Sequence, residues 1–203
     1  MSSTARIHLV RHGTTLLNRA NRYRGRRDVP LDAGGWQDAW TAAAELQEVG
    51  LTAIYSSPCR RARDTARVVA DAAALTTVLD MPGFLNLDYG VWEGLTSEEA
   101  AEQDPQAYAA YQAYAPDAVC PGGESLARAA ERMLLGLRTV ALLHPGESIG
   151  AVSHAAMLRL VIANVTDLPR KDWRHELPNG SVCVFDVDGS DIQLVRMPVA
   201  ARG

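Results

Sequence analysis

Short apolar runs alternate with longer amphipathic segments along most of this 203-residue chain, and this alternation limits the possible folds more than any other feature. Because helical crossovers join neighbouring parallel strands, it predicts an α/β fold: a three-layer α/β/α sandwich around a mostly parallel central sheet. The Asp188-Gly189 pair predicts a hairpin between the last two strands. The expected strands cover residues 6–10, 52–55, 76–79, 148–153, 181–187 and 192–195. The expected main helices cover residues 32–50, 58–74 and 154–165, with a further long helix after Gly123.

The middle of the chain, at about residues 81–122, interrupts this alternation. Its first half is rich in glycine, proline and aromatic residues, and two helix starts follow. Thr96 with Glu99 matches a capping box, and Asp104-Pro105 matches an N-cap followed by proline at the first helical position. We therefore expect one domain over residues 1–203, with a helical, cap-like insertion that packs over one end of the sheet.

Overall charge and composition argue against several classes of partner. The net charge is −4 and 47% of the residues are hydrophobic, so the chain can bury a large core and has no general attraction for nucleic acid or anionic membranes. Its three cysteines (Cys59, Cys120 and Cys183) are far apart and form no CxxC pair, which indicates reduced thiols. No segment resembles a signal peptide or a membrane span. We expect a cytoplasmic protein, either a monomer or a homodimer.

Four basic side chains lie at the ends of predicted strands. Arg11 and His12 follow the first strand, Arg61 starts the helix after the second, and His154 follows the strand at residues 148–153. Because ligands of open parallel sheets bind at the carboxyl ends of the strands, these side chains are expected to meet at one edge. Two guanidiniums, two imidazoles and helix N-termini suit a phosphoryl group. A neutral imidazole is also a competent nucleophile.

Simpler interpretations of these residues are open at this point. A single histidine after a strand is more often a hydrogen-bonded structural residue than a catalyst, and Arg60 and Arg67 fit a solvated helix face. His12 and His154 could bind a metal, but no Asp, Glu or Cys at a recognisable spacing supplies a third ligand. The joint placement of four such groups at strand ends favours the phosphoryl site.

Five short motifs also occur in order along nearly the whole chain. They are LVRHGTTLLN at 9–18, YRGRRDVPLDAGG at 23–35, SSPCRRARDTA at 56–66, DYGVWEGLT with PGGES at 88–125, and AVSHAAMLR at 151–159. Together they resemble the histidine phosphatase superfamily, which has the phosphoglycerate mutase-like fold. The resemblance is greatest to its small phosphatase branch, which includes α-ribazole phosphatase-like and broad-specificity members. An isolated Arg-His-Gly is a weak signal, whereas five motifs in order are strong.

The resemblance implies a phosphomonoester hydrolase that uses no metal or cofactor and acts on a small phosphorylated metabolite in two steps. His12 would attack the phosphoryl group to form phosphohistidine, and water would then hydrolyse this intermediate. Arg11, Arg61 and His154 would hold the phosphoryl oxygens and their developing charge. Asn18 would contribute a neutral donor.

Two positions depart from the family pattern where its proton donor is expected. Family members usually carry a glutamate at the place of Asn86, or, in the other branch, an aspartate at the place of Ala155. Neither residue can donate a proton and become an anion, and general acid help contributes roughly 10²–10⁴-fold. The alignment could be shifted by a residue or two, the substrate could have a good leaving group, or turnover could be poor. Alternatively, a nearby carboxylate substitutes, and the candidates are Asp88, Glu93 and Glu124.

A further departure is Arg24, at a position where glutamine is common. It lies in a loop with four other arginines: Arg19, Arg22, Arg26 and Arg27. The loop fits a solvated surface. It also fits a binding role, in which Arg22 or Arg24 contacts a second anionic group on the substrate.

Three functions are compatible with these observations: a phosphomonoester hydrolase, a phosphoglycerate mutase that uses the same phosphohistidine, and a weakly catalytic protein that binds phosphate esters. Mutases of the family tend to carry a basic insertion in the middle block. Residues 96–119 contain no Lys or Arg, which favours hydrolysis over the mutase reaction. The weakly catalytic alternative rests on Asn86 and Ala155.

Overall fold

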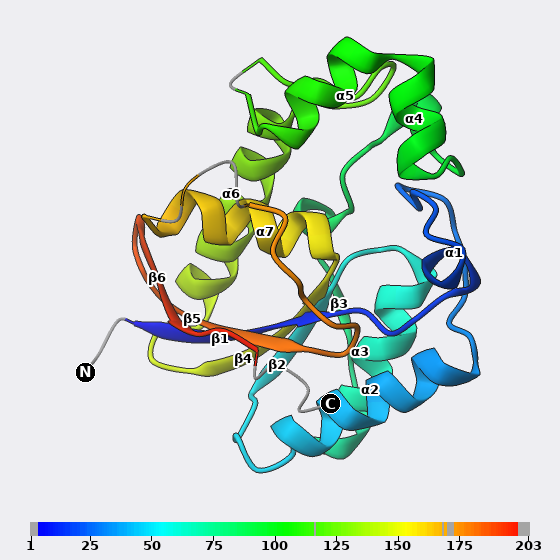
Figure 1. Ribbon diagram of the computed structural model, residues 1–203. Coiled ribbons are helices and arrows are strands. Elements are labelled where there is room, and N and C mark those ends of the chain that lie inside the picture. Colours follow the sequence, from blue (N-terminus) through cyan, green and yellow to red (C-terminus); the bar gives the residue numbers. More distant parts are fainter. Residues whose placement is uncertain (1–3, 116, 168, 170–172, 199–203) are drawn as a thin grey trace.

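Six strands form one sheet at the centre of the structure, a computed structural model that describes residues 4–115, 117–167, 169 and 173–198 (Figure 1). Their order across the sheet is β3-β2-β4-β1-β5-β6. The strands are β1 (Ala5–Arg11), β2 (Ala53–Ser56), β3 (Leu79–Asp80), β4 (Ser148–Ser153), β5 (Val182–Asp188) and β6 (Asp191–Arg196).

The sheet is mostly parallel, as predicted. Neighbouring strands from β3 to β1 run parallel, whereas β5 is antiparallel to both β1 and β6. Asp188 pairs with Asp191, which closes the predicted hairpin. The third strand shares only Leu79 with the predicted run at 76–79, because β3 covers just the residues that pair with Tyr55 and Ser56 of β2, its single neighbour. Short edge strands of this kind limit unwanted pairing with other chains.

Helices cover both faces of the sheet, which confirms the three-layer prediction (Figure 1). The alternation of side chains along β1 shows the two layers: Ile7 and Leu9 pack in one apolar cluster, and Val10 packs in the other. The first cluster contains residues of α6 (Leu126–Leu143) and α7 (Ala155–Val165). The second contains residues of α2 (Ala33–Leu46) and α3 (Arg60–Ala72).

Side-chain caps begin several helices at the predicted residues. Asp32 accepts a hydrogen bond from the Gly35 amide at 2.8 Å at the start of α2. Thr96 and Glu99 form the expected capping box of α4 (Ser97–Gln103). Asp104 caps α5 (Pro105–Gln112), where proline follows it at the first helical position. These helix starts are local, because each cap bonds an amide three residues along the chain.

The segment around α4 and α5 lies outside the three layers, on the side of the molecule that carries α1 (Leu16–Arg19) (Figure 1). The turns η1 (Pro82–Phe84) and η2 (Gly90–Trp92) precede it. Arg22, in the loop after α1, donates to Glu99 of α4 at 2.7 Å, and the Tyr23 amide donates to the Leu95 carbonyl. These hydrogen bonds therefore join the loop after β1 to the helical insertion.

Two further expectations concern cysteines and membranes. All three cysteines are free and buried, and burial raises the pKa of the Cys120 and Cys183 thiols to about 12. Within the described ranges, no helix combines the length and the apolar character that crossing a bilayer requires.

Candidate active site

Three β-to-α junctions bring basic side chains together at the carboxyl edge of the sheet. His12 follows β1, His154 lies between β4 and α7, and Arg61 lies in the first turn of α3, which follows β2. Because β2, β4 and β1 are adjacent in the sheet, the three junctions are neighbours. The ring centroids of His12 and His154 are 5.0 Å apart, and Arg61 lies within hydrogen-bond distance of both rings.

Arg61 is fully buried and links the two rings to the loop before α2. Its Nε donates to His12 Nε2 at 3.3 Å, and its Nη2 lies 3.2 Å from His154 Nδ1. Nη1 donates to the Arg27 carbonyl and Nη2 to the Gly25 carbonyl, both at 2.8 Å. Because the guanidinium is planar and carries its donors in a fixed fork, these four contacts determine its orientation.

The hydrogen bonds also determine which ring nitrogens carry protons. His12 Nδ1 lies 2.7 Å from the Gly13 carbonyl, which can only accept, so Nδ1 is protonated and Nε2 keeps its lone pair. His154 Nδ1 accepts from Arg61, so its Nε2 carries the proton and donates to Ser57 Oγ at 2.8 Å. In this pattern His12 Nε2 keeps its lone pair, whereas His154 Nε2 carries a proton.

Both rings are neutral at neutral pH for a physical reason. Burial, and then the neighbouring positive charge of Arg61, lower the pKa of His12 and of His154 well below the ordinary histidine value. Arg11 and Arg24 lower the pKa of His12 further. An unprotonated imidazole is the form that can attack phosphorus.

Gly13, the third residue of the Arg-His-Gly motif, allows a close approach between two segments. A Cβ at this position would lie 2.1 Å from the Gly35 carbonyl oxygen, at the start of α2. Its amide donates to Thr65 Oγ1 on α3 at 3.0 Å. The glycine therefore lets the junction after β1 pack against both α2 and α3, which holds His12 in place.

A cavity of about 520 Å³ opens beside the histidines. Six predicted site residues line it: Arg11, Asn18, Arg24, Asn86, His154 and Ala155. His12 does not; its side chain is 1% exposed and packs edge-on against His154. His154, which lines the cavity, separates it from the buried ring of His12.

Arg11 and Asn18 both have donors available beside the cavity. Arg11 Nη1 donates to the Leu177 carbonyl, and its buried Nε has no hydrogen-bond partner in the described part of the chain. Burial, followed by the charges of Arg24 and Arg159, lowers the pKa of Arg11 to about 9, so the guanidinium remains charged at neutral pH. Asn18 Oδ1 accepts from Thr15, which leaves its Nδ2 as the donor that can contact a ligand.

Asn86 is buried in the wall of the cavity, where the family's acid was expected. Its Nδ2 donates to the Gly25 carbonyl at 3.1 Å, the same oxygen that accepts from Arg61. Its Oδ1 is buried without a partner among residues 4–115, 117–167, 169 and 173–198. The side chain is thus next to the reaction site and cannot supply a proton.

The three substitute carboxylates proposed from the sequence are engaged elsewhere. Glu93 accepts from the Arg26 amide at 2.7 Å, Asp88 pairs with Arg26 at 3.2 Å, and Glu124 pairs with Arg132 at 2.6 Å. None of the three lines the cavity. Glu98 is the only carboxylate among the described residues that does, and it is exposed.

The five-arginine loop divides into four paired arginines and Arg24. Carboxylates neutralise four members: Arg19 pairs with Asp32, Arg22 with Glu99, Arg26 with Asp88 and Arg27 with Glu93. Arg24 lines the cavity, donates from Nη1 to the Arg22 carbonyl, and pairs with no carboxylate within the described ranges. The solvated-loop interpretation therefore fails for Arg24, and Arg22, which also lines the cavity, is already neutralised by Glu99.

Two cationic residues of the cavity, Arg159 and Arg174, did not enter the sequence interpretation. Arg159 closes the AVSHAAMLR motif, and its position four residues after Ala155 on α7 places it on the same helix face. This four-residue spacing is the sequence signal that could have identified Arg159 as a cavity residue. Arg174 lies in an irregular segment whose sequence carries no comparable pattern.

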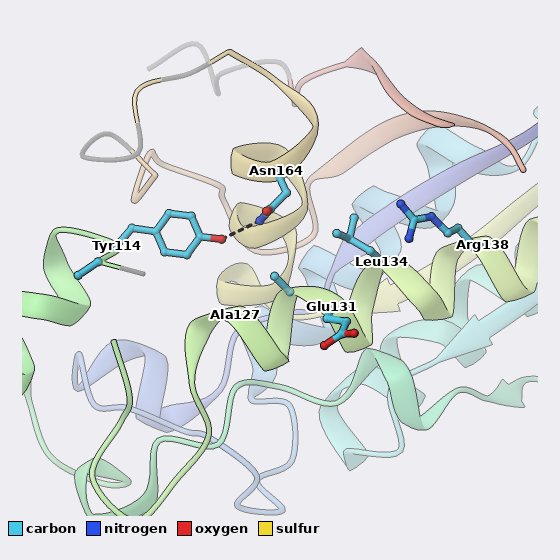
Figure 2. A pocket seen from close by; sticks show the side chains of 8 residues that line it. Tyr114, Ala127, Glu131, Leu134, Arg138 and Asn164 are labelled. Carbon is cyan, nitrogen blue, oxygen red and sulfur yellow. Dashed lines mark hydrogen bonds between the residues drawn. The ribbon is translucent and has the colours of Figure 1, made fainter. Parts of the chain in front are cut away.

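A second hollow, of about 260 Å³, lies between α6 and the segment around Tyr114 (Figure 2). It shares no lining residue with the first, and Asn164 bridges it by donating to the Tyr114 hydroxyl at 2.7 Å. Neither His12 nor His154 lines it, whereas His154 lines the larger cavity. The described residues contain no group of three or more His, Cys, Asp and Glu side chains that could hold a metal ion.

Comparisons with known proteins agree with this geometry. A sequence profile of the histidine phosphatase superfamily (branch 1) matches residues 7–199, and the chain belongs to that superfamily. It is 35% identical over 167 residues to a metal-independent phosphoserine phosphatase of Arabidopsis thaliana, covering 81% of this chain and 70% of that protein. The structure resembles a putative α-ribazole-5′-P phosphatase of Escherichia coli, with a TM-score of 0.81, 26% identity and 98% coverage of both chains.

A longer relative shows that this fold also occurs within larger proteins. The chain is 36% identical over 196 residues to a bifunctional protein of Mycobacterium tuberculosis, a match that covers 94% of this chain and 53% of that protein. The chain therefore spans about half the length of that relative.

Proposed function

We propose that the protein is a metal-independent phosphomonoester hydrolase that works through a phosphohistidine at His12. One observation carries the proposal: the neutral ring of His12, with its Nε2 lone pair held beside Arg61 and His154, lies behind a cavity lined by arginines. The phosphatase among its relatives supports the same reaction class.

The proposed reaction has two displacement steps. His12 Nε2 attacks phosphorus, the P–N bond forms, and the P–O bond to the alcohol breaks with its electron pair on the leaving oxygen. Water then attacks phosphorus, the P–N bond breaks, and inorganic phosphate leaves. Arg61 Nε now occupies the lone pair of His12, so this donor turns to a phosphoryl oxygen when substrate binds. Arg11 adds its unpartnered Nε to the same oxygens.

The absence of an acid at Asn86 determines which substrates react fast. An alkoxide is a poor leaving group without a proton, whereas an aryl, acyl or pyrophosphoryl oxygen leaves as a stable anion. We therefore expect turnover to depend steeply on the acidity of the leaving alcohol. A plot of log kcat against the leaving-group pKa for a series of aryl phosphates measures this dependence.

A phosphate-release screen over a panel of phosphorylated metabolites, with an aryl phosphate as the reference, tests the proposal. Activity is expected in the wild type and a loss of roughly 10³-fold or more in His12→Ala. His144→Gln serves as the matched control, because this histidine lies at the end of α6, bonded to Tyr55 and Glu147. Equal phosphate release by the His12→Ala and wild-type proteins would overturn the proposal. Isomerisation of 3-phosphoglycerate without phosphate release would identify a mutase instead.

A further inference from the structure

The cavity holds more positive charge than one phosphoryl group needs. Besides Arg11, it is lined by Arg24, Arg159 and Arg174. None of these four has a carboxylate within 4.0 Å among the described residues, in contrast to the neighbouring loop arginines. Like charges that face one cavity without counterions repel one another, and a bound polyanion removes this repulsion.

Arg159 is positioned to contact a group that lies beside the phosphoryl position. It is one turn after Ala155 on α7, which corresponds to about 6 Å along the helix axis. Helical side chains point toward the helix N-terminus, so Arg159 is directed back toward His154. Between His154 and Arg159, the methyl groups of Ala155 and Ala156 line the cavity, and their small size leaves this space open. The Arg159 Nε donates to the His175 carbonyl at 2.8 Å, and neither Nη group makes a hydrogen bond to the residues that the structure describes.

Arg174 lies beside aromatic residues that line the cavity. Its guanidinium carbon is 5.6 Å from the centroid of the Tyr111 ring, and Nη1 donates to Gln112 Oε1. The Tyr111 hydroxyl lies 3.3 Å from that of Tyr89. These aromatic residues offer hydroxyl groups beside Arg174, and the one carboxylate among the described residues that lines the cavity, Glu98, is exposed and makes no ion pair with Arg174.

The electrostatics connect these arginines to the reaction site. The charges of Arg24 and Arg159 both lower the pKa of Arg11, after burial, which is the largest cause. Burial is the largest cause that lowers the pKa of Arg159, and the charge of Arg174 lowers it further. Arg11, Arg24, Arg159 and Arg174 all line the cavity, and Arg24 keeps a buried Nε without a partner among the described residues.

We propose that Arg159 and Arg174, together with Arg24, form a second anion subsite that binds a carboxylate or phosphate group on the leaving part of the substrate. The subsite lies about one helical turn from the phosphoryl position. This inference rests on the proposed function and specifies its substrate class: small phosphomonoesters with a second anionic group a few bonds from the ester oxygen.

The test compares substrates that differ in the distal group. Glycerol 3-phosphate has a hydroxymethyl group where 3-phosphoglycerate has a carboxylate, and propane-1,3-diol bisphosphate places a second phosphate at a similar distance. For the wild type, we expect kcat/KM to be about 10–100-fold higher on the better of the two substrates with a second anionic group than on glycerol 3-phosphate. The larger of the two gains identifies carboxylate or phosphate as the preferred group.

The double variant Arg159→Gln/Arg174→Gln removes both charges and keeps side chains of similar shape. The substrate preference is expected to fall toward 1 in this variant. Arg128→Gln, an exposed position on α6, is the matched control and is expected to retain the preference. A preference that survives in the double variant, or its absence in the wild type, would overturn the subsite.

A binding measurement separates this inference from the proposed function. Calorimetry with His12→Ala protein compares the affinities for 3-phosphoglycerate, propane-1,3-diol bisphosphate and glycerol 3-phosphate without turnover. Tighter binding of a ligand with a second anionic group supports the subsite if it depends on Arg159 and Arg174. This holds even if the wild type releases no phosphate. Phosphate release with equal binding of all three ligands supports the hydrolase and refutes the subsite.

Discussion

The two ends of the cavity are built in different ways. At the reaction end, His12, Arg61 and His154 come from three adjacent strand-to-helix junctions, are almost completely buried, and bond to one another and to backbone carbonyls. At the distal end, Arg159 comes from the body of α7 and Arg174 from an irregular segment beside α5. Under the proposed function, the sheet positions the reacting groups, whereas elements outside the sheet supply the proposed second subsite.

The hydrogen-bond partners show the same contrast. Arg61 makes four bonds within the protein, and the three that do not involve His12 fix its position before a ligand arrives. Arg24, which belongs to the proposed second subsite, instead keeps a buried Nε without a partner among the described residues. Under the proposed function, the first arrangement serves the reaction and the second serves the recognition of a further group on the substrate.

The largest effect is expected from Arg61→Lys. Lysine keeps the charge but loses the planar fork, so the two rings lose their common donor. We expect kcat/KM to fall by about 10²–10³-fold, by the same factor on an aryl phosphate and on 3-phosphoglycerate. Arg67→Lys, on the exposed side of the same helix, is the control. A loss confined to one substrate would contradict the division between a reaction end and a recognition end.

Asn86→Glu is expected to produce the next largest effect, in the favourable direction. It places a carboxylic acid in the cavity wall beside Gly25, where it can protonate a leaving alkoxide. We expect kcat on alkyl phosphates to rise by about 10–10²-fold, with little change on aryl phosphates. Asn86→Gln has the same length without the proton, and an equal gain in this variant would show that size rather than acidity is responsible.

A smaller effect is expected in the pH dependence of stability. Burial and Arg61 hold the pKa of His12 and His154 below the unfolded value, so below about pH 6.5 the unfolded chain binds more protons than the folded protein. The free energy of unfolding therefore falls as the pH decreases, by at most about 1.4 kcal/mol per pH unit for each ring. Urea titrations between about pH 7.5 and pH 5.5 measure this slope.

Two variants relate this slope to the reaction end. In His12→Gln/His154→Gln the slope is expected to flatten, and His8 accounts for part of the remainder, because burial lowers its pKa as well. Arg159→Gln/Arg174→Gln is expected to keep the wild-type slope, since neither arginine is among the main causes of the two shifts. Identical slopes in the wild type and the double histidine variant would refute the assignment of this pH dependence to His12 and His154.

Much of the fold and the reaction end could be predicted from local sequence signals. The caps at Asp32, Thr96 and Asp104 act over three residues, and strand periodicity acts over two, so the printed sequence contains both partners of each interaction. The strand predicted at 76–79 lies at 79–80 instead, because its position depends on pairing with Tyr55 and Ser56 of β2, which are distant in the chain. The positions of His12, Arg61 and His154 followed from a general rule about parallel sheets.

The sequence by itself determined the α/β architecture, the family and the basic side chains at the strand ends, because these depend on short-range patterns and on the direction of parallel strands. Only the tertiary structure decided that Glu99 neutralises Arg22 while Arg24 stays unpaired, that Asn86 faces the cavity, and that Arg174 joins it. Arg22 and Glu99 are 77 residues apart in the chain. Charge pairing depends on which side chains meet in space, and such long-range neighbours leave no local pattern in a single sequence.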